Sequence, residues 1–473
     1  MRRTAGRLLA TLGIIAVLVA LPLTGARAQT SRDWPMYLNN AARTGYAGAE
    51  KAITRSTAHK LRMLWTDHVD GAISAQPIQV GGVVYYGSWD GYERAVDARS
   101  GAQLWAAFIG ITTDTSCEPP TTVGVASTAM VVTIKVNGTA TRAVFVGGGD
   151  GNFYALNASN GRVIWQTRLG TSPGYFLWSS PVLYRGSIYE GVASFGDCPL
   201  IRGGVVRMDT ATGKVQNRFY TVPRGCTGAG VWGSPTVDTA TGDIYFATGN
   251  GGPCARRERL GVALVRTTAS LRLLGSWQVP AKQQPDIDSD FGSTPTLFSA
   301  SIGGVVHRMV GLQNKDGIYY AFDRRAISRG PLWESRMAPP AGNCPECGGT
   351  DGADISPSAY DGHHLFIGSE MTRIKGVTCA GSLREMQPST GRVVWADCLQ
   401  SGPVLGAVTA VPGVAFVTAG NTVYAAGTSK GSILWKYQDT NGGSWGGFWG
   451  APTISNGRLF VGHQNGRVYA FGV

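Results

Sequence analysis

Three alternating carboxylates and one lysine are the residues of this 473-residue chain whose types and spacing best suit chemistry. Asp286, Asp288 and Asp290 stand directly before a predicted strand. Lys315 lies in the tight turn that ends at Gly317, between runs of alternating β-branched and aromatic residues that predict a hairpin. A hairpin requires neither the carboxylates nor the lysine. These charges are therefore the first candidates for a functional site.

The same carboxylates suggest a metal site as an alternative. Asp286-x-Asp288-x-Asp290-x-Gly292 resembles the opening of a calcium loop, in which carboxylates occupy alternate positions. The downstream glutamate of such a loop is missing, since an apolar strand follows from Thr294. The six histidines form no H-x-x-x-H pair and no G-x-S-x-G segment occurs, so the motifs of zinc peptidases and serine hydrolases are absent.

Residues 1–28 have the pattern of a signal peptide. Arg2, Arg3 and Arg7 precede an apolar run that reaches about Leu23, and Ala26-Arg27-Ala28 offers a small-x-small cleavage site. The apolar run is too short for a good membrane span. We therefore expect a mature chain, residues 29–473, that is exported to the periplasm or the extracellular space and has no membrane span.

The charge and the cysteines narrow the class of protein. A net charge of +12 without a run of lysines or arginines argues against nucleic acid as a partner. Eight cysteines in an exported chain predict disulfides. The candidate pairs are Cys344 with Cys347, Cys379 with Cys398, and a pairing among Cys117, Cys198, Cys226 and Cys254. Glycine, not histidine, follows Cys347, so this C-x-x-C is no c-type haem site.

An internal repeat indicates the fold. Each unit has an S-x-P-like entry, short strands separated by glycine turns, and a closing T-G-x-x-x-W segment. The units close at Trp105, Trp165, Phe219, Trp277, Trp333, Trp395 and Trp435, and Trp65 opens the first. Residues 29–473 are thus predicted to form one all-β domain, an eight-bladed propeller of four-stranded antiparallel blades. Pairing Leu61–Trp65 with the last strand would close the ring and remove its exposed edge. The repeated tryptophans are expected to pack between blades.

Blade geometry brings four candidate residues to one face. The loop that enters an innermost strand and the turn between the second and third strands lie on the same face of a propeller. Trp232 and Asn250 come from the fourth blade, and Asp290 and Lys315 from the fifth. An aromatic plane, an amide, a carboxylate and an ammonium at one channel mouth predict a small-molecule site. Three further tryptophans near innermost strands are expected to face the channel, namely Trp178, Trp445 and Trp449.

On these repeats, and on the entry Asp33-Trp34-Pro35-Met36-Tyr37, the chain resembles the pyrroloquinoline-quinone (PQQ) repeat propellers and, among them, the quinoprotein alcohol dehydrogenases. The resemblance implies that Asp290, in Asp-Phe-Gly, is the base that takes the proton from the alcohol. It implies that Lys315 contacts the quinone oxygens and that Asn250, in Thr-Gly-Asn, is a calcium ligand. Trp232, in Gly-Val-Trp, would lie under the quinone.

Three departures from the family pattern refine the expectation. Asp197 stands about one residue out of register with the glutamate that binds calcium in the family. With Asp197 in that place, the expected calcium ligands are Asn250, Asp197 and Asp290. Cys117 is single where many members have a vicinal cysteine pair. Without a haem motif, electrons would pass to a separate acceptor such as a cytochrome c. The chain is thus most similar to the polyvinyl-alcohol dehydrogenase branch, which implies secondary or polymeric alcohols as substrates. The alternative is a cofactor-free propeller that acts as a binding or assembly scaffold.

Overall fold

The computed structural model describes Met1 and residues 32–473, apart from 117–118, 255–256, 285–287, 340–353 and 442–446. The predicted signal peptide lies outside the described residues and stays a prediction. Arg32–Val473 form one compact unit. In the described part of the chain, no helix is long and apolar enough to cross a membrane.

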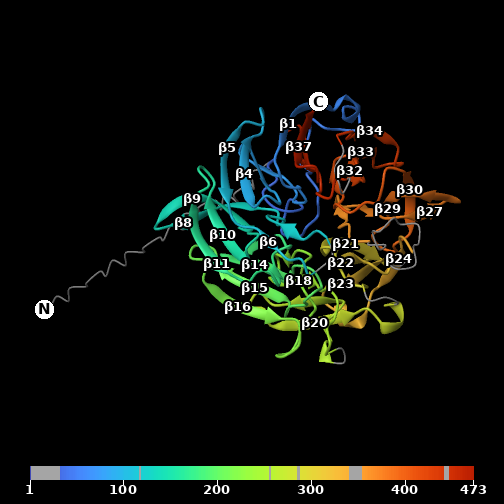
Figure 1. Cartoon of the computed structure of the whole chain (residues 1–473). Coiled ribbons are helices and arrows are strands. Elements are labelled where there is room, and N and C mark those ends of the chain that lie inside the picture. Colours follow the sequence, from blue (N-terminus) through green and yellow to red (C-terminus); the bar gives the residue numbers. More distant parts are fainter. Residues whose placement is uncertain (2–31, 117–118, 255–256, 285–287, 340–353, 442–446) are drawn as a thin grey trace. The chain divides into compact units, whose positions relative to one another are not determined.

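Eight antiparallel sheets form the blades of a propeller, which confirms the predicted fold (Figure 1). The first blade comprises β2 (Ile78–Val80), β3 (Val83–Gly87), β4 (Tyr92–Asp97) and β5 (Gln103–Phe108), and the second comprises β8 (Met130–Val136), β9 (Thr139–Gly147), β10 (Asn152–Asn157) and β11 (Val163–Arg168). The third blade comprises β13 (Val182–Tyr184), β14 (Ser187–Ser194), β15 (Gly204–Asp209) and β16 (Val215–Tyr220), and the fourth comprises β17 (Thr236–Asp238), β18 (Asp243–Ala247), β19 (Ala263–Thr267) and β20 (Leu273–Gln278).

Blades five to eight continue the pattern around the ring. The fifth blade comprises β21 (Thr296–Ile302), β22 (Val305–Asn314), β23 (Ile318–Asp323) and β24 (Trp333–Arg336), and the sixth comprises β25 (Ala359–Tyr360), β26 (Leu365–Ser369), β29 (Gly381–Met386) and β30 (Val393–Leu399). The seventh blade comprises β31 (Thr409–Val411), β32 (Val414–Ala419), β33 (Thr422–Gly427) and β34 (Ile433–Gln438), and the eighth comprises β35 (Thr453–Ser455), β36 (Arg458–Gly462), β37 (Arg467–Gly472) and β1 (Arg62–His68). The minor elements are β6 (Thr112–Thr113), β7 (Thr122–Val123), β12 (Tyr175–Phe176), β27 (Thr372–Ile374), β28 (Val377–Cys379), η1 (Ala58–Lys60), η3 (Ala281–Gln283) and η4 (Ile327–Arg329).

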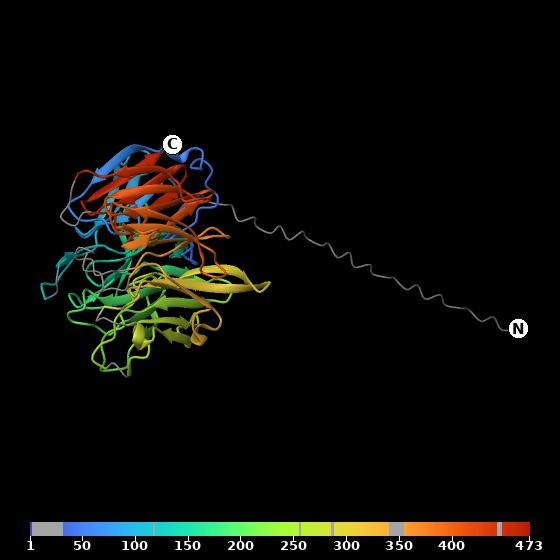
Figure 2. The same ribbon diagram turned by 90° about the vertical axis from the view of Figure 1, so that its right-hand side faces the viewer.

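The eighth blade joins the two ends of the propeller, as predicted. β1 pairs antiparallel with β37, with Trp65 opposite Ala470 and Thr66 opposite Tyr469. Figures 1 and 2 both show the blue first strand beside the red last one. The backbone groups of β37 are thereby paired on both sides, and no strand edge stays open at the seam.

The closing tryptophans tie each blade to the next. The indole N–H of Trp105 donates to the Ala158 carbonyl at 2.9 Å, and that of Trp333 to the Pro388 carbonyl at 2.9 Å. Each ring also covers the glycine of the following T-G-x-x-x-W segment; a Cβ at Gly161 would lie 2.7 Å from the Trp105 ring. The repeated Gly and Trp are therefore two halves of one contact between blades, and the predicted packing role is confirmed.

Gly391→Ala should lower the free energy of unfolding by about 2–5 kcal/mol. Gly391 has a φ of 69°, and its Cβ would lie 2.4 Å from the Trp333 ring. The left-handed backbone costs an alanine roughly 1–2 kcal/mol, and the forced overlap adds about 1–3 kcal/mol. Gly138→Ala is the matched control, because its φ is 80° with no atom within 4 Å of the added Cβ. Equal losses in urea unfolding would show that the contact with Trp333 contributes nothing.

The S-x-P-like entries form a chain of hydrogen bonds around the channel. The Thr128 hydroxyl accepts from the Gln76 amide at 2.8 Å, and the Ser180 hydroxyl from the Thr128 amide at 3.0 Å. Ser234 accepts from Ser180 at 2.9 Å, and Thr294 from Ser234 at 2.9 Å. The hydroxyl of each entry thus satisfies a buried amide of the preceding blade, which holds the walls of the channel in register.

The segment 32–50, which precedes the first blade, hydrogen-bonds to all eight blades. Its backbone or side-chain partners are Gln79, Val131, Ser180, Pro181, Val237, Leu297, Tyr360, Ala410, Ser455 and Gly457. Arg43 is fully buried at its centre and donates to the carbonyls of Tyr37, Ser180, Pro181 and Pro235 at 2.7–3.1 Å. One short segment therefore joins blades that are distant in sequence.

Two of the predicted disulfide assignments are confirmed. Cys379 is bonded to Cys398, and within the group of four Cys226 is bonded to Cys254. The expected Cys344–Cys347 bond and residue Cys117 lie outside the described residues.

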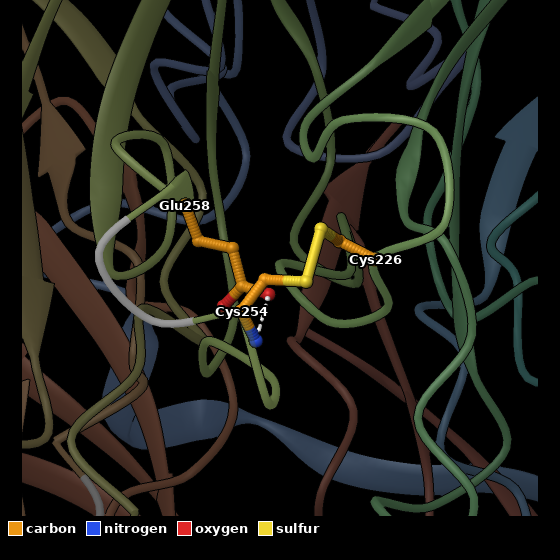
Figure 3. A group of neighbouring side chains, drawn as sticks. All are labelled: Cys226, Cys254 and Glu258. Atoms are coloured by element: carbon orange, nitrogen blue, oxygen red, sulfur yellow. Dashed lines mark hydrogen bonds between the residues drawn. A yellow bond between two sulfur atoms is a disulfide. The ribbon is translucent and has the colours of Figure 1, made fainter.

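Glu258 lies beside the Cys226–Cys254 disulfide (Figure 3). Its carboxylate accepts from the amides of Gly252 and Cys254 at 2.5 and 3.1 Å. The two sulfurs are bonded to each other, so this cluster stabilises a loop and offers no thiolate to a metal.

Candidate active site

A cavity of about 800 Å³ occupies the channel at the entries to the innermost strands. Its aromatic lining is Tyr37, Trp89, Trp178, Phe195, Trp232 and Trp449. Of the tryptophans expected to face the channel, Trp178 and Trp449 line the cavity with Trp232, whereas Trp445 lies outside the described residues. Tyr37 belongs to the segment that joins the blades. The cavity is thus large enough for an organic cofactor and is mainly apolar.

The structure brings to this cavity the five residues with a predicted catalytic, cofactor or metal role. Trp232 precedes β17, Asn250 follows β18, Asp290 precedes β21, and Lys315 occupies the turn between β22 and β23. Asp197, which follows β14 in the third blade, lines the same cavity. Residues that are more than a hundred positions apart therefore meet because the blades place equivalent loops on one face.

Asp290 is the central carboxylate of the site. Its Oδ2 accepts the indole N–H of Trp232 at 2.8 Å, and its Oδ1 forms an ion pair with the Lys315 ammonium at 2.8 Å. Its backbone carbonyl accepts the Lys315 amide at 3.2 Å and the Asn314 side-chain amide at 3.0 Å. The Asp290 side chain is only 8% exposed. Backbone and side chain are both fixed, so the carboxylate has one orientation in the cavity.

Burial and the neighbouring charges set the protonation of this group. Burial raises the pKa of Asp290 to about 6, although Lys315 opposes the rise. Burial alone would lower the pKa of Lys315, but Asp290 and Asp288 hold that pKa above its usual range. Burial would likewise raise the pKa of Asp288, yet the Lys315 charge outweighs it and lowers that pKa. Near pH 7 Lys315 therefore stays a charged ammonium, whereas Asp290 is a carboxylate that can gain and lose a proton.

Asp288 is the residue whose role the sequence analysis missed. Both its oxygens bind the Lys315 ammonium, at 2.8 and 2.7 Å, and its Oδ1 also accepts the Asn250 amide at 2.9 Å. The same amide donates to Asp197 Oδ2 at 3.0 Å. A continuous polar network therefore crosses from the third blade to the fifth. The alternate spacing of Asp288 and Asp290 was the available signal, because residues i and i+2 of an extended segment point the same way.

Oxygen donors gather on one side of this network. The side chains of Asp197 and Asp288 both approach Asn250, and carboxylate and amide oxygens are the ligands that Ca²⁺ prefers. Both oxygens of Asp290 have partners within the chain, and so do both oxygens of Asp288. Asp288 is therefore a further candidate ligand beside the predicted set of Asn250, Asp197 and Asp290, which stays a prediction. Asp286, the first residue of the alternative calcium loop, lies outside the described residues.

Comparison with known proteins identifies the family. The model of the glucose/ethanol/alcohol dehydrogenase β-propeller domain, a PQQ family, matches residues 34–172. A second PQQ model, described as outer membrane protein assembly factor BamB, matches residues 315–473. The two matches together cover more than half of the chain. The chain belongs to the PQQ-repeat β-propeller family.

Relatives of this PQQ-repeat propeller include quinoprotein alcohol dehydrogenases. A polyvinylalcohol dehydrogenase of Pseudomonas sp. is 24% identical over 86% of this chain and 70% of its own length. The quinohemoprotein alcohol dehydrogenase of Comamonas testosteroni is 23% identical over 63% of this chain and 46% of its own length. The chain thus spans less than half of that longer relative.

Solved structures support the same fold. Quinohemoprotein alcohol dehydrogenase ADHIIG from Pseudomonas putida HK5 has a TM-score of 0.74 at 17% identity, over 93% of this chain and 80% of that one. BamB from Moraxella catarrhalis has a TM-score of 0.55 at 14% identity, over 87% and 98% of the two chains. The PQQ-repeat architecture is therefore common to enzymes and to an assembly factor. The fold does not distinguish these two functions, so the residues of the site must.

Proposed function

We propose that this chain is an exported alcohol dehydrogenase that uses PQQ and calcium, oxidises secondary or polymeric alcohols, and passes electrons to a separate acceptor such as a cytochrome c. The observation that carries the proposal is Asp290, a buried carboxylate held between Trp232 and Lys315 at the wall of a largely apolar cavity. The signal peptide pattern and the disulfides support export.

The residues of the cavity fit the cofactor and the metal. Trp232 offers an aromatic face, and this face depends on Gly292, because a Cβ there would lie 2.1 Å from the Trp232 ring. Lys315 would bind the quinone oxygens, and Asn250 with Asp197 and Asp288 would hold calcium. When bound, PQQ supplies a hydride acceptor whose carbonyl the metal polarises.

Within this arrangement Asp290 takes the hydroxyl proton of the alcohol. Its raised pKa keeps the carboxylate basic enough to accept a proton near neutral pH, and its two partners keep it from rotating away. The aromatic wall that includes Trp178 and Trp449 limits water around the reacting groups and binds the apolar part of an alcohol.

Activity should rise with pH and level off above about pH 6. The base acts only as the carboxylate, so kcat/KM falls as pH drops through the Asp290 pKa of about 6. The Trp232 N–H lowers this pKa by donating to the carboxylate, so Trp232→Phe should move the acidic limb to higher pH. A limb near pH 4 in the parent, or a shift to lower pH in the variant, would contradict this assignment.

Titration of the mature protein with PQQ, with and without calcium, tests the proposal directly. We expect stoichiometric, calcium-dependent quenching of tryptophan fluorescence, because the quinone would lie on Trp232. Trp232→Phe should reduce the quenching but not abolish it, because other tryptophans line the same cavity, whereas Trp277→Phe, on the outer strand of its blade, should leave the quenching unchanged. Absence of binding in both conditions would favour the scaffold function.

The scaffold function is the second candidate, and the match of residues 315–473 to the BamB model favours it. A scaffold, however, has no use for a buried ammonium that is paired in the channel with one buried carboxylate, Asp290, and one half-exposed carboxylate, Asp288. Burial of charged groups costs free energy, and catalysis or ligand binding would explain why the chain has such groups in its channel. The Asp288–Lys315–Asp290 network therefore favours the enzyme.

A further inference from the structure

A second cavity, of about 600 Å³, lies between the fifth and sixth blades. It is bounded by β24 of blade five and by β27, β29 and β30 of blade six. Three arginines line it, Arg336, Arg373 and Arg384, together with the Thr372 hydroxyl. No acidic residue of the described chain lines it. The cavity therefore presents three guanidinium groups without a carboxylate among them.

Arg384 is the most informative of the three, because its residue is only 6% exposed. Its Nη2 donates to the Thr372 hydroxyl at 2.8 Å, and its Nη1 lies 3.5 Å from the Met337 sulfur. Among the described residues it forms no ion pair. A buried guanidinium is unfavourable unless an anion compensates its charge. Within the described chain this charge has neutral partners only.

The other two arginines bind backbone carbonyls. Arg336 Nη1 donates to the Asp316 carbonyl at 3.0 Å and to the Ala338 carbonyl at 3.3 Å, and Arg373 Nη2 donates to the Gly376 carbonyl at 3.3 Å. A guanidinium has five N–H donors, so each arginine keeps donors for another acceptor. Carbonyl partners fix the two side chains without neutralising them.

The nearby carboxylates of the described chain, Asp354 and Asp316, form no ion pair with the three arginines. Asp354 attracts Arg384 over a longer distance; its Oδ1 accepts the Glu370 amide at 2.9 Å, and its Oδ2 has no hydrogen-bond partner among the described residues. Asp316 accepts the Ile318 amide at 2.9 Å and the Tyr320 hydroxyl. Neither carboxylate lines the cavity. The positive charge of the three arginines is therefore available to a ligand inside the cavity.

We propose that this cavity binds a small organic anion, a carboxylate or a phosphate monoester that carries an apolar tail. The guanidinium groups match the paired oxygens of either anion, and the Thr372 hydroxyl adds a donor. The apolar tail would pack against Met337, Ile374 and Val393, which line the same cavity. This site is separate from the Asp290 cavity and does not depend on the proposed oxidation.

Calorimetric titrations of the full mature chain with hexanoate and with hexyl phosphate test the proposal at low ionic strength. We expect one of the two to bind at one site, with hexanamide, a neutral analogue that is not an alcohol, at least tenfold weaker. The better anion identifies the class of ligand. Binding of neither anion, or equal binding of the neutral amide, would overturn the proposal.

Variants locate the site. Arg373→Gln should weaken binding about tenfold, since it removes charge-assisted hydrogen bonds. Its side chain is exposed and, within the described residues, hydrogen-bonds to the Gly376 carbonyl alone, so the variant should fold. Arg392→Gln, an exposed arginine outside the cavity, is the matched control and should bind normally. Lys315→Met should also leave binding unchanged. Equal loss in both arginine variants would show a surface charge effect, and loss in the lysine variant would place the anion in the other cavity.

Discussion

Replacing Asp290 with asparagine should reduce dye-linked turnover of a secondary alcohol by about 10²–10⁴-fold, while PQQ still binds. The amide keeps the shape of the carboxylate and can still accept the Trp232 N–H, which lies 2.8 Å from Oδ2. It cannot take a proton from an alcohol. The loss should therefore appear in kcat at saturating PQQ and calcium, measured with a dye as electron acceptor.

Asp316→Asn is the matched control for that experiment. Asp316 is also buried in blade five, and burial raises its pKa to about 6, but it bonds to Ile318 and Tyr320 and does not line the cavity. We expect lower stability with normal turnover per folded molecule. Full turnover in the Asp290 variant, or equal loss in both variants, would show that Asp290 is not the base.

Lys315→Met should lower the free energy of unfolding by about 3 kcal/mol and abolish tight PQQ binding. The ammonium is 12% exposed and lies 2.7–2.8 Å from both Asp288 and Asp290, so its removal leaves two carboxylates without a cation. Removing one partner of a buried ion pair typically costs about 3–5 kcal/mol. Urea unfolding and the PQQ titration measure the two effects separately. Lys315→Arg should restore part of both.

A double variant tests whether charge imbalance causes that loss. Asp288→Asn, added to Lys315→Met, removes one of the unpaired carboxylates and should recover part of the stability. It should not recover PQQ binding, because the ammonium that would contact the quinone is still missing. Stability that stays at the parent level in Lys315→Met would mean that the ion pairs contribute nothing to folding.

The fold could be predicted from the sequence because its contacts repeat. Each T-G-x-x-x-W segment encodes one contact between neighbouring blades, seen in Trp105 over Gly161 and in Trp333 over Gly391. Each S-x-P-like entry encodes one hydrogen bond around the channel, such as that from Ser180 to Ser234. A contact that recurs at a regular spacing can be read from the spacing alone.

The site could be predicted in part. Trp232, Asn250, Asp290 and Lys315 stand in segments that the family resemblance singles out, and the blade geometry places them on one face. Asp288 could not be ranked among them, because its importance lies in binding Lys315 and Asn250 at the same time. The alternate spacing with Asp290 predicts that the two side chains point the same way, but it does not reveal partners in two other loops.

The sequence by itself thus determined the eight blades, the closure of the ring and most of the residues that meet in the channel, because these follow from a repeated local pattern. Only the tertiary structure decided how the segment 32–50 joins all eight blades through groups such as the buried Arg43. It also decided that Asp288 lies between Asn250 and Lys315. Both depend on contacts that occur once, between positions far apart in the chain, and a contact without a repeat leaves no periodic trace in the sequence.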